Sequence, residues 1–149
     1  MILRPFSSND WPILFQNQYP GMPPKDIQSL IAQWNTRQHD GRYFEMLAID
    51  VDGRIIGYVS LYAQDDGSIS EGVEIYTPFR RQGFAYTAVS ILLQYAKDLG
   101  YQTITAQIRQ DNVDSLALHD KLGFQIADSF INKRGNPVHA LVRSLYIQY

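Results

Sequence analysis

The 149-residue sequence contains no cysteine. Disulfide bonds, thiolate metal sites and acyl-cysteine intermediates are therefore excluded, and the composition suits a reducing compartment, so we expect a cytoplasmic protein. The histidines His39, His119 and His139 lie far apart in the chain and lack the spacing of metal ligands. We therefore expect no bound metal.

Long apolar runs and an excess of charge are also missing. No run approaches the roughly 20 apolar residues of a membrane helix, and residues 1–10 lack the pattern of a signal peptide. The formal net charge of −2 argues against the broad basic surface of a nucleic-acid-binding protein. We expect neither a membrane nor a nucleic acid as partner. A chain that is 45% hydrophobic and 19% charged predicts one globular domain spanning residues 1–149.

Hydrophobic periodicity divides the chain into short strands and helices. Period-two segments separated by turn residues, such as Asp52-Gly53, predict strands, and stripes of period 3.6 predict helices. The expected strands cover residues 1–6, 43–51, 54–62, 69–76, 103–109, 124–132 and 139–147. The expected helices lie near residues 10–15, 24–34, 84–99 and 112–122. This order indicates an α+β fold, with a mixed, mostly antiparallel sheet of about seven strands and helices on both faces.

Residues 76–99 join a strand to a long helix through a basic turn. Pro78 cannot donate to a sheet ladder and ends the strand. Gly83 and Ala85 leave room beside the first helical amides, which have no internal partner and lie at the positive end of the macrodipole. The turn predicts a phosphate site on the amides of residues 81–86, although an ordinary strand-to-helix turn with surface arginines shares this pattern. The expected packed face of the helix comprises Phe84, Ala88, Ile91, Leu92, Tyr95 and Leu99.

Two motifs resemble those of the GNAT superfamily of N-acetyltransferases. The turn Arg80-x-x-Gly83-x-Ala85 is similar to the family's Arg/Gln-x-x-Gly-x-Gly/Ala segment. Residues 112–124, NVDSLALHDKLGF, are similar to its Asn-x-x-Ala/Ser-x-x-Leu/Phe-Tyr-x-Lys-x-Gly-Phe segment. The order of expected elements also matches that fold from end to end. The resemblance implies acetyl-CoA-dependent transfer of an acetyl group to a primary amine, by direct attack in a ternary complex.

The resemblance also implies contacts with the cosubstrate. In the family, the amides of the turn hold the pyrophosphate of acetyl-CoA. The position of Asn112 contacts the pantetheine arm or orients the next helix, and a purely capping role stays open here. A free amide near Ile75 or Tyr76 is expected to stabilise the oxyanion. The full set expected to contact acetyl-CoA is Ile75, Tyr76, Thr77, Arg80, Arg81, Gln82, Gly83, Phe84, Ala85, Tyr86, Asn112 and Ser115.

The candidate acid and base depart from the usual pattern of the family. Many members protonate the leaving thiolate with a tyrosine, at the position that His119 occupies here. A histidine can donate a proton near neutral pH, but it can also serve only as a packing residue. The alternative donors are Tyr86, Tyr101 and Tyr146. Glu71 and Glu74 are candidate bases. Because they are three residues apart they face opposite sides of the strand, and Glu71 is the first choice.

The acceptor amine is expected beside the N-terminal helices and the strand of Glu71. The candidates there are Trp11, Tyr19 and Trp34, since aromatic faces near a carboxylate suit a cation. A second hypothesis stays open, in which the domain is catalytically silent and binds acyl-CoA as a sensor or partner module. The expected partners are acetyl-CoA and the amine, with the chain acting as a monomer or a homodimer.

Overall fold

The computed structural model describes residues 1–146. The chain begins with β1 (Ile2–Pro5), a 3₁₀ turn (Ser8–Asp10), α1 (Trp11–Asn17) and α2 (Pro24–Trp34). Then follow β2 (Gln38–His39), β3 (Arg42–Val51), β4 (Arg54–Ala63), β5 (Ile69–Ile75), a 3₁₀ turn (Thr77–Phe79) and α3 (Phe84–Asp98). The last elements are β6 (Thr103–Arg109), α4 (Val113–Lys121), β7 (Gln125–Ile131) and β8 (Pro137–Ser144). Residue 147 of the last expected strand lies outside the described residues.

The strands form one mixed sheet, as expected. Their order is β1-β3-β4-β5-β6-β8-β7, and β2 pairs with β3. Among the described strands, β5 and β6 make the one parallel pair, and the other pairs are antiparallel. The sheet has eight strands rather than about seven, because the expectation missed the two-residue strand β2. Asp52 and Gly53 both have positive φ and close the β3–β4 hairpin, which confirms that turn.

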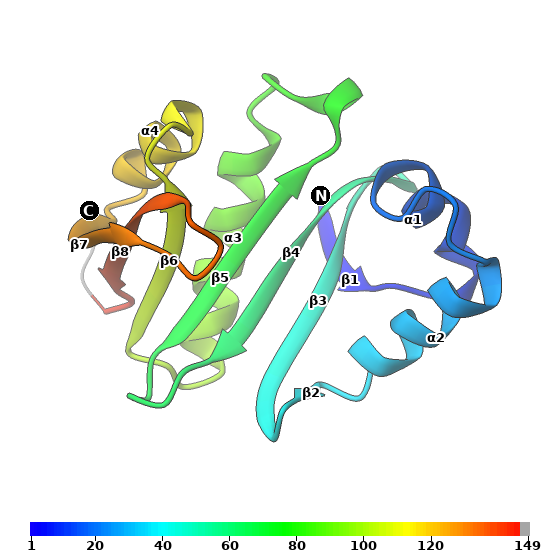
Figure 1. Cartoon of the computed structure of the whole chain (residues 1–149), viewed down its shortest axis with the longest axis horizontal. Coiled ribbons are helices and arrows are strands. Elements are labelled where there is room, and N and C mark those ends of the chain that lie inside the picture. The colour runs from blue at the N-terminus through cyan, green and yellow to red at the C-terminus, as the bar shows by residue number, and fades with distance from the viewer. Residues whose placement is uncertain (147–149) are drawn as a thin grey trace.

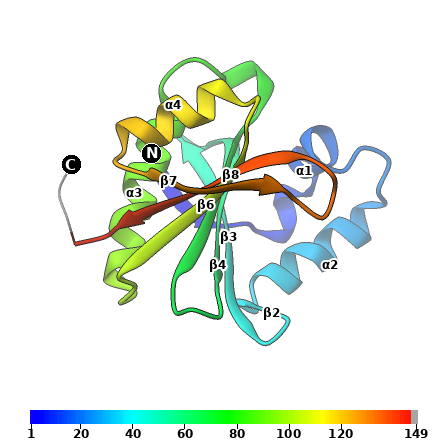
Figure 2. The same ribbon diagram turned by 60° about the vertical axis from the view of Figure 1, so that its left-hand side comes forward.

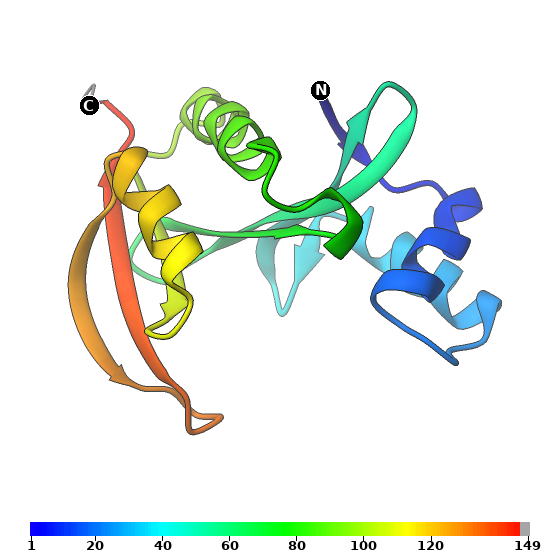
Figure 3. The same cartoon turned by 90° about the horizontal axis from the view of Figure 1, so that it is seen from above.

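Helices cover both faces of the sheet, which is also confirmed. Figure 3 shows α3 on one side and α1 and α2 on the other, and Figure 2 shows α4 near α3 and next to β7 and β8. Two buried clusters match this arrangement. One packs α3 against residues such as Ile69 and Ile75 of β5. The second packs Leu14 and Ile27, from α1 and α2, against Tyr76.

The packed face of α3 differs from the expected one. Its buried residues are Ala88, Val89, Leu92, Leu93 and Ala96. Ile91 and Leu99 are 38% and 41% exposed, so assigning them to the core was wrong. Two of the buried residues are alanines, whose small side chains let α3 lie close to the sheet. The buried face of α3 is therefore rotated around the helix axis, toward Ala96, relative to the expected face. Ile91 and Leu99 lie at the edges of this buried face.

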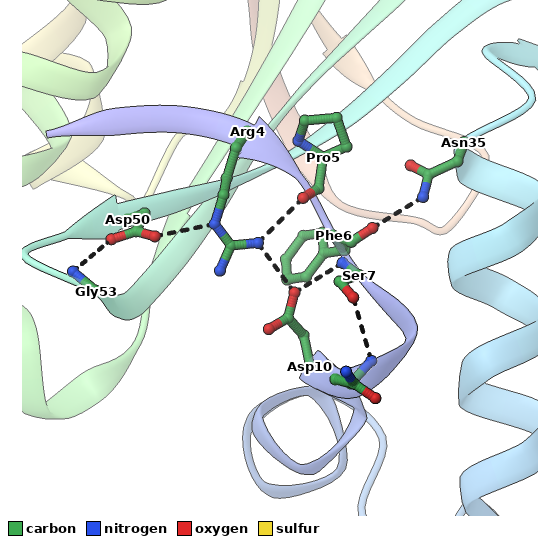
Figure 4. A network of polar contacts seen from close by, with 9 residues as sticks. Arg4, Pro5, Phe6, Ser7, Asp10, Asn35, Asp50 and Gly53 are labelled. Carbon is green, nitrogen blue, oxygen red and sulfur yellow. Dashed lines mark hydrogen bonds and ion pairs between the residues drawn. The ribbon is translucent and has the colours of Figure 1, made fainter.

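Two polar networks hold the outer elements. Arg4 donates to Asp50 over 2.9 Å and to Asp10 over 3.0 Å, so it ties β1 to β3 and to the turn before α1 (Figure 4). On the α3 side, the buried carboxylate of Glu45 accepts hydrogen bonds from Tyr43 and, over 2.7 Å, from Tyr95 of α3. Every side chain in the two networks has a partner, as burial requires. None of the helices within residues 1–146 combines the length and apolar composition needed to cross a bilayer.

Candidate active site

The parallel pair β5–β6 separates after two residues. The strands pair at Ile69 with Ile104 and at Ser70 with Thr105, and then diverge (Figure 1). Beyond that point, in the part of the chain that the structure describes, β5 pairs only with β4 and β6 only with β8. The result is a wedge between β5 and β6 whose inner backbone edges have no partner strand among residues 1–146. We call it the β5–β6 gap.

Hydrogen-bond alternation shows which amides of β5 face the gap. The Tyr76 amide donates to the Ile56 carbonyl over 2.8 Å. Hydrogen-bonded pairs recur every second residue along an antiparallel ladder, so the next bonded pair is Glu74 with Tyr58. In an antiparallel ladder, the residues between bonded pairs direct N–H and C=O away from the partner strand. Glu71, Val73 and Ile75 therefore direct their peptide groups into the gap. Of the two expected oxyanion donors, Ile75 keeps a free amide. The expectation for Tyr76 was wrong, because its amide already donates to the Ile56 carbonyl.

The turn before α3 has the geometry of an anion site. Arg81 and Gly83 have positive φ, and the first helical bond runs from the Thr87 amide to the Gly83 carbonyl. The amides of residues 81–86 have no acceptor within the described part of the chain. A Cβ placed on Gly83 would meet no atom within 4 Å, so the space beside these amides is open. Exposed amides at the positive end of a 15-residue helix are suited to a phosphate.

The side chain of Arg80 closes the turn against β5. Its Nε donates to the Ile75 carbonyl over 2.7 Å, and a terminal nitrogen lies 2.5 Å from Glu74. The Arg80 amide donates to the Thr77 carbonyl. Arg80 thus supports the anion site by holding the turn, while its guanidinium is paired with protein atoms.

Two sequence-predicted catalytic residues meet at the base of the gap. Glu71 is the first residue of β5 after the last pair with β6, and its carboxylate contacts Nε2 of His119 from α4. Both residues are buried, with 8% and 1% of their surfaces exposed. The ring of Phe124 packs edge-on against the imidazole with a centroid distance of 4.8 Å. Oε2 of Glu71 is buried and has no hydrogen-bond partner among the described residues.

The two contacts of the imidazole determine where its protons are. Nδ1 of His119 lies 2.7 Å from the Ser115 carbonyl, which can only accept, so Nδ1 carries a hydrogen. Nε2 faces Glu71, and a hydrogen bond there requires a second proton shared between ring and carboxylate. Burial opposes a charge on His119, but the bond to Glu71, their attraction and the Ser115 carbonyl together raise its pKa above the usual value.

Glu74 lies on the opposite face, among aromatic residues. It pairs in register with Tyr58, and both belong to the side covered by α1 and α2. Burial raises the pKa of Tyr58 and Tyr76, and each phenol also interacts electrostatically with Glu74 and Tyr19. This cluster places Glu74, rather than Glu71, beside the predicted aromatic acceptor residues. Tyr58 was missed by the sequence analysis, although its place opposite Glu74 in the hairpin was a usable signal.

The remaining predicted residues are more dispersed. Tyr19 packs near Trp34, with ring centroids 6.5 Å apart, whereas Trp11 packs edge-on against Phe15. Asn112 accepts a hydrogen bond from the Ser115 amide over 3.2 Å, which confirms its capping role. Among the alternative acids, Tyr86 and Tyr146 are 45% and 56% exposed. No polar contact joins Tyr86, Tyr101 or Tyr146 to the Glu71–His119 pair within residues 1–146.

A polar pocket of about 440 Å³ adjoins the anion site. Tyr86 and Lys97 of α3 line one side, and Lys121 at the end of α4 lines another. The ammonium of Lys97 lies 5.2 Å from the ring centroid of Tyr146. The two lysines make the pocket attractive to an anion.

Comparison with known proteins identifies the family. A family model described as an acetyltransferase (GNAT) domain matches residues 1–125. An uncharacterised N-acetyltransferase of the SPβ prophage of Bacillus subtilis is 27% identical over 63% of this chain and 55% of its own length. A Pseudomonas aeruginosa acetyltransferase of L-methionine sulfoximine and L-methionine sulfone is 28% identical over 70% of this chain and 63% of its own. The chain thus spans less than two thirds of these relatives.

Solved structures show the same fold. A chimera of spermidine N-acetyltransferase from Vibrio cholerae and a second protein, hSSAT, superposes with a TM-score of 0.79 at 19% identity, covering 97% of this chain and 96% of that one. A putative acetyltransferase from Salmonella typhimurium, with acetyl-CoA as its cofactor, superposes with a TM-score of 0.74 at 16% identity. That match covers 100% of this chain and 96% of the other.

Proposed function

Since the chain belongs to the GNAT acetyltransferase domain family, we propose that it transfers the acetyl group of acetyl-CoA to a primary amine by direct attack in a ternary complex. The observation that carries the proposal is the β5–β6 gap, which has free amides of residues 81–86 near its open end and the Glu71–His119 pair at its base. A ligand with an anionic end and a long amide-bearing arm fits such a site.

The dimensions of the gap suit acetyl-CoA. Four residue steps separate Ile75 from Glu71, about 13 Å at a strand rise of roughly 3.3 Å. The pantetheine arm has roughly twelve bonds between phosphate and sulfur, about 14 Å when extended at the spacing of an extended peptide. With the pyrophosphate on residues 81–86, the sulfur reaches the level of His119. The arm's amides can bond the peptide groups of Val73, and its carbonyls can accept from the Ile75 amide; the Ile75 carbonyl already accepts from Arg80. The pocket beside Tyr86, with Lys97 and Lys121, would take the nucleotide end.

The residues at the base of the gap then serve the chemistry. The ammonium of the acceptor loses a proton to water, and the neutral amine attacks the thioester carbonyl while a gap-facing amide of β5 near Glu71 stabilises the oxyanion. Ile75, about 13 Å from Glu71, is too far from the sulfur for this role. As the carbon–sulfur bond breaks, the thiolate takes a proton from His119. Protons released by the amine return through water to the Glu71–His119 pair. A histidine with a raised pKa is well matched to a thiol, whose ordinary pKa is about 8.5.

We place the acceptor on the α1–α2 face. The pair of Glu71 and His119 lies on the α3–α4 face, so the amine must arrive from the opposite side of the gap. There Glu74, Tyr19 and Tyr58 provide a carboxylate and aromatic surface. The guanidinium nearby, from Arg80, is already paired with Glu74. We therefore propose that the acceptor is a cationic amine with no carboxylate group next to its amino group. Acetyl transfer should be slower to an amino acid than to the amine that lacks its carboxylate.

Binding of CoA provides the direct test. At 100 times its Kd, CoA stabilises the folded chain by about 2.7 kcal/mol, which corresponds to roughly 5–11 °C in Tm for this size. Gly83→Glu places a charged side chain in the open space beside the amides and should abolish this shift. Gly100→Glu is the matched control, because Gly100 also has positive φ and open space around its Cβ. Both variants should lose intrinsic stability, but only the control should keep the CoA shift.

An undiminished CoA shift in folded Gly83→Glu would refute the anion site. Acetyl transfer itself is measured by release of free thiol from acetyl-CoA with a panel of amines. A protein that binds CoA at this turn but releases no thiol with any amine would instead support the sensor or partner-module hypothesis.

A further inference from the structure

The Glu71–His119 pair has a property that neither residue has alone. Because Nδ1 donates to the Ser115 carbonyl, a neutral imidazole would present the lone pair of Nε2 to the carboxylate of Glu71. That arrangement is repulsive and leaves a buried negative charge without a hydrogen-bond donor, which is strongly unfavourable. One additional proton removes both penalties and makes the pair neutral overall.

We propose that Glu71 is a positioning residue: it holds the His119 ring against β5 and keeps it in the protonated, proton-donating form until the thiolate departs. This inference rests on the proposed function and deepens it. It also assigns Glu71 a different role from the base beside the acceptor that the sequence suggested. The change follows from its direction, since Glu71 points to α4 and not to the aromatic face of α1 and α2.

The surroundings leave Glu71 as the group that controls the proton. Asp120 and Lys121, the charged neighbours of His119 on α4, are exposed. Arg143 of β8 donates through Nε to the Leu122 carbonyl at the end of α4 over 2.6 Å. Glu71 is the ionisable side chain that bonds the ring among the described residues.

The second oxygen of Glu71 explains how a buried pair can take part in a reaction. Oε2 is buried without a partner, and such atoms in native proteins require an explanation. Glu71 is also the residue at which β5 leaves β6. A ligand in the gap can therefore satisfy Oε2 with an N–H or O–H donor, which couples occupancy of the gap to the proton held between Glu71 and His119.

Glu71→Gln tests the proposal with little change in shape. The amide nitrogen of glutamine can donate to Nε2 of a neutral His119, so the contact and the fold are retained while the charge is lost. The titration of His119 is followed by NMR of its ring signals, assigned with His119→Gln. In the wild type, the ring should stay protonated well above its ordinary pKa of about 6.5. In Glu71→Gln, it should titrate below that value.

Kinetics give the functional half of the test. The alkaline limb of the kcat profile should move to lower pH in Glu71→Gln. At a fixed pH above the His119 pKa of both proteins, kcat should fall about tenfold for each unit by which that pKa falls. The KM for acetyl-CoA should stay within about twofold, because the arm binds backbone groups. Adding Glu71→Gln to His119→Gln should cause little further loss, since the two residues act as one unit.

The outcomes separate the inference from the proposed function. An unchanged His119 titration in Glu71→Gln would overturn the inference, and so would a shifted titration with an unchanged pH profile, which indicates a structural pair. If the wild type transfers no acetyl group to any amine, the proposed function fails together with the positioning role, while the NMR titration still decides the charge of the pair.

Discussion

Tyr95→Phe isolates one hydrogen bond of the buried Glu45 network. Glu45 is 3% exposed, and its carboxylate accepts from the Tyr95 hydroxyl over 2.7 Å and from Tyr43. Arg37 lies 3.3 Å from the other carboxylate oxygen. Removing the Tyr95 hydroxyl deletes a bond to a charged acceptor, which contributes about 1.5–3 kcal/mol. Because two partners remain and Tyr95 is partly exposed, the expected loss is about 1.5–2 kcal/mol.

This loss should lower Tm by about 3–8 °C for a chain of this length. Thermal and urea unfolding followed by circular dichroism measure it, and the urea m-value should stay constant. Tyr101→Phe is the matched control. Tyr101 is also a partly buried tyrosine packed near α3, but its hydroxyl makes no hydrogen bond within the described residues. The control should change stability by less than about 0.5 kcal/mol. If Tyr95→Phe is no less stable than Tyr101→Phe, the network contributes no net stability and the reasoning fails.

Two further predictions concern the N-terminal network and the α4 cap. The bond from Arg4 holds the pKa of Asp50 below its ordinary value, so this stabilisation is present above about pH 4 and is lost as the pH falls through the folded-state pKa. The Tm of the wild type should therefore fall more steeply with acid than that of Arg4→Gln, and parallel Tm curves would contradict this. Asn112→Ala should cost about 1 kcal/mol through loss of the cap, whereas Asn112→Asp should retain it. Equal Tm values for these two variants would argue against the cap.

The fold was largely readable from the sequence because its elements carry strong local patterns. The strands of β3 and β4 alternate, and the Asp52-Gly53 turn fixes their hairpin. β2 was missed because two exposed residues, Gln38 and His39, carry no periodic signal. The packed face of α3 was misplaced because a helical stripe of period 3.6 does not show which of its small residues touch the sheet.

The site was only partly predictable. The anion turn is continuous in sequence, so a local motif was enough to find it. Glu71 and His119 were each singled out, but they are 48 positions apart and no local rule indicates that they touch. Likewise, strand alternation placed Glu71 and Glu74 on opposite faces without showing which face holds α4. That choice depends on the long-range packing of α4, which puts Glu71 against His119 and leaves Glu74 on the α1–α2 face.

The short pairing of β5 with β6 also affects how firmly the two halves of the sheet are held together. The sheet has two antiparallel halves, one formed before α3 and one after it, which pair with each other only at Ile69–Ile104 and Ser70–Thr105 among the described residues. Elsewhere the halves are joined by side chains of the core under α3. Each half contains a local hairpin unit, β3–β4–β5 in one and β7–β8 in the other, and the short seam between the halves is where we expect local opening to cost least. A cosubstrate in the gap would bond the free edges of both β5 and β6, as a strand between them would. Its binding would therefore also stabilise the sheet against separation of the two halves.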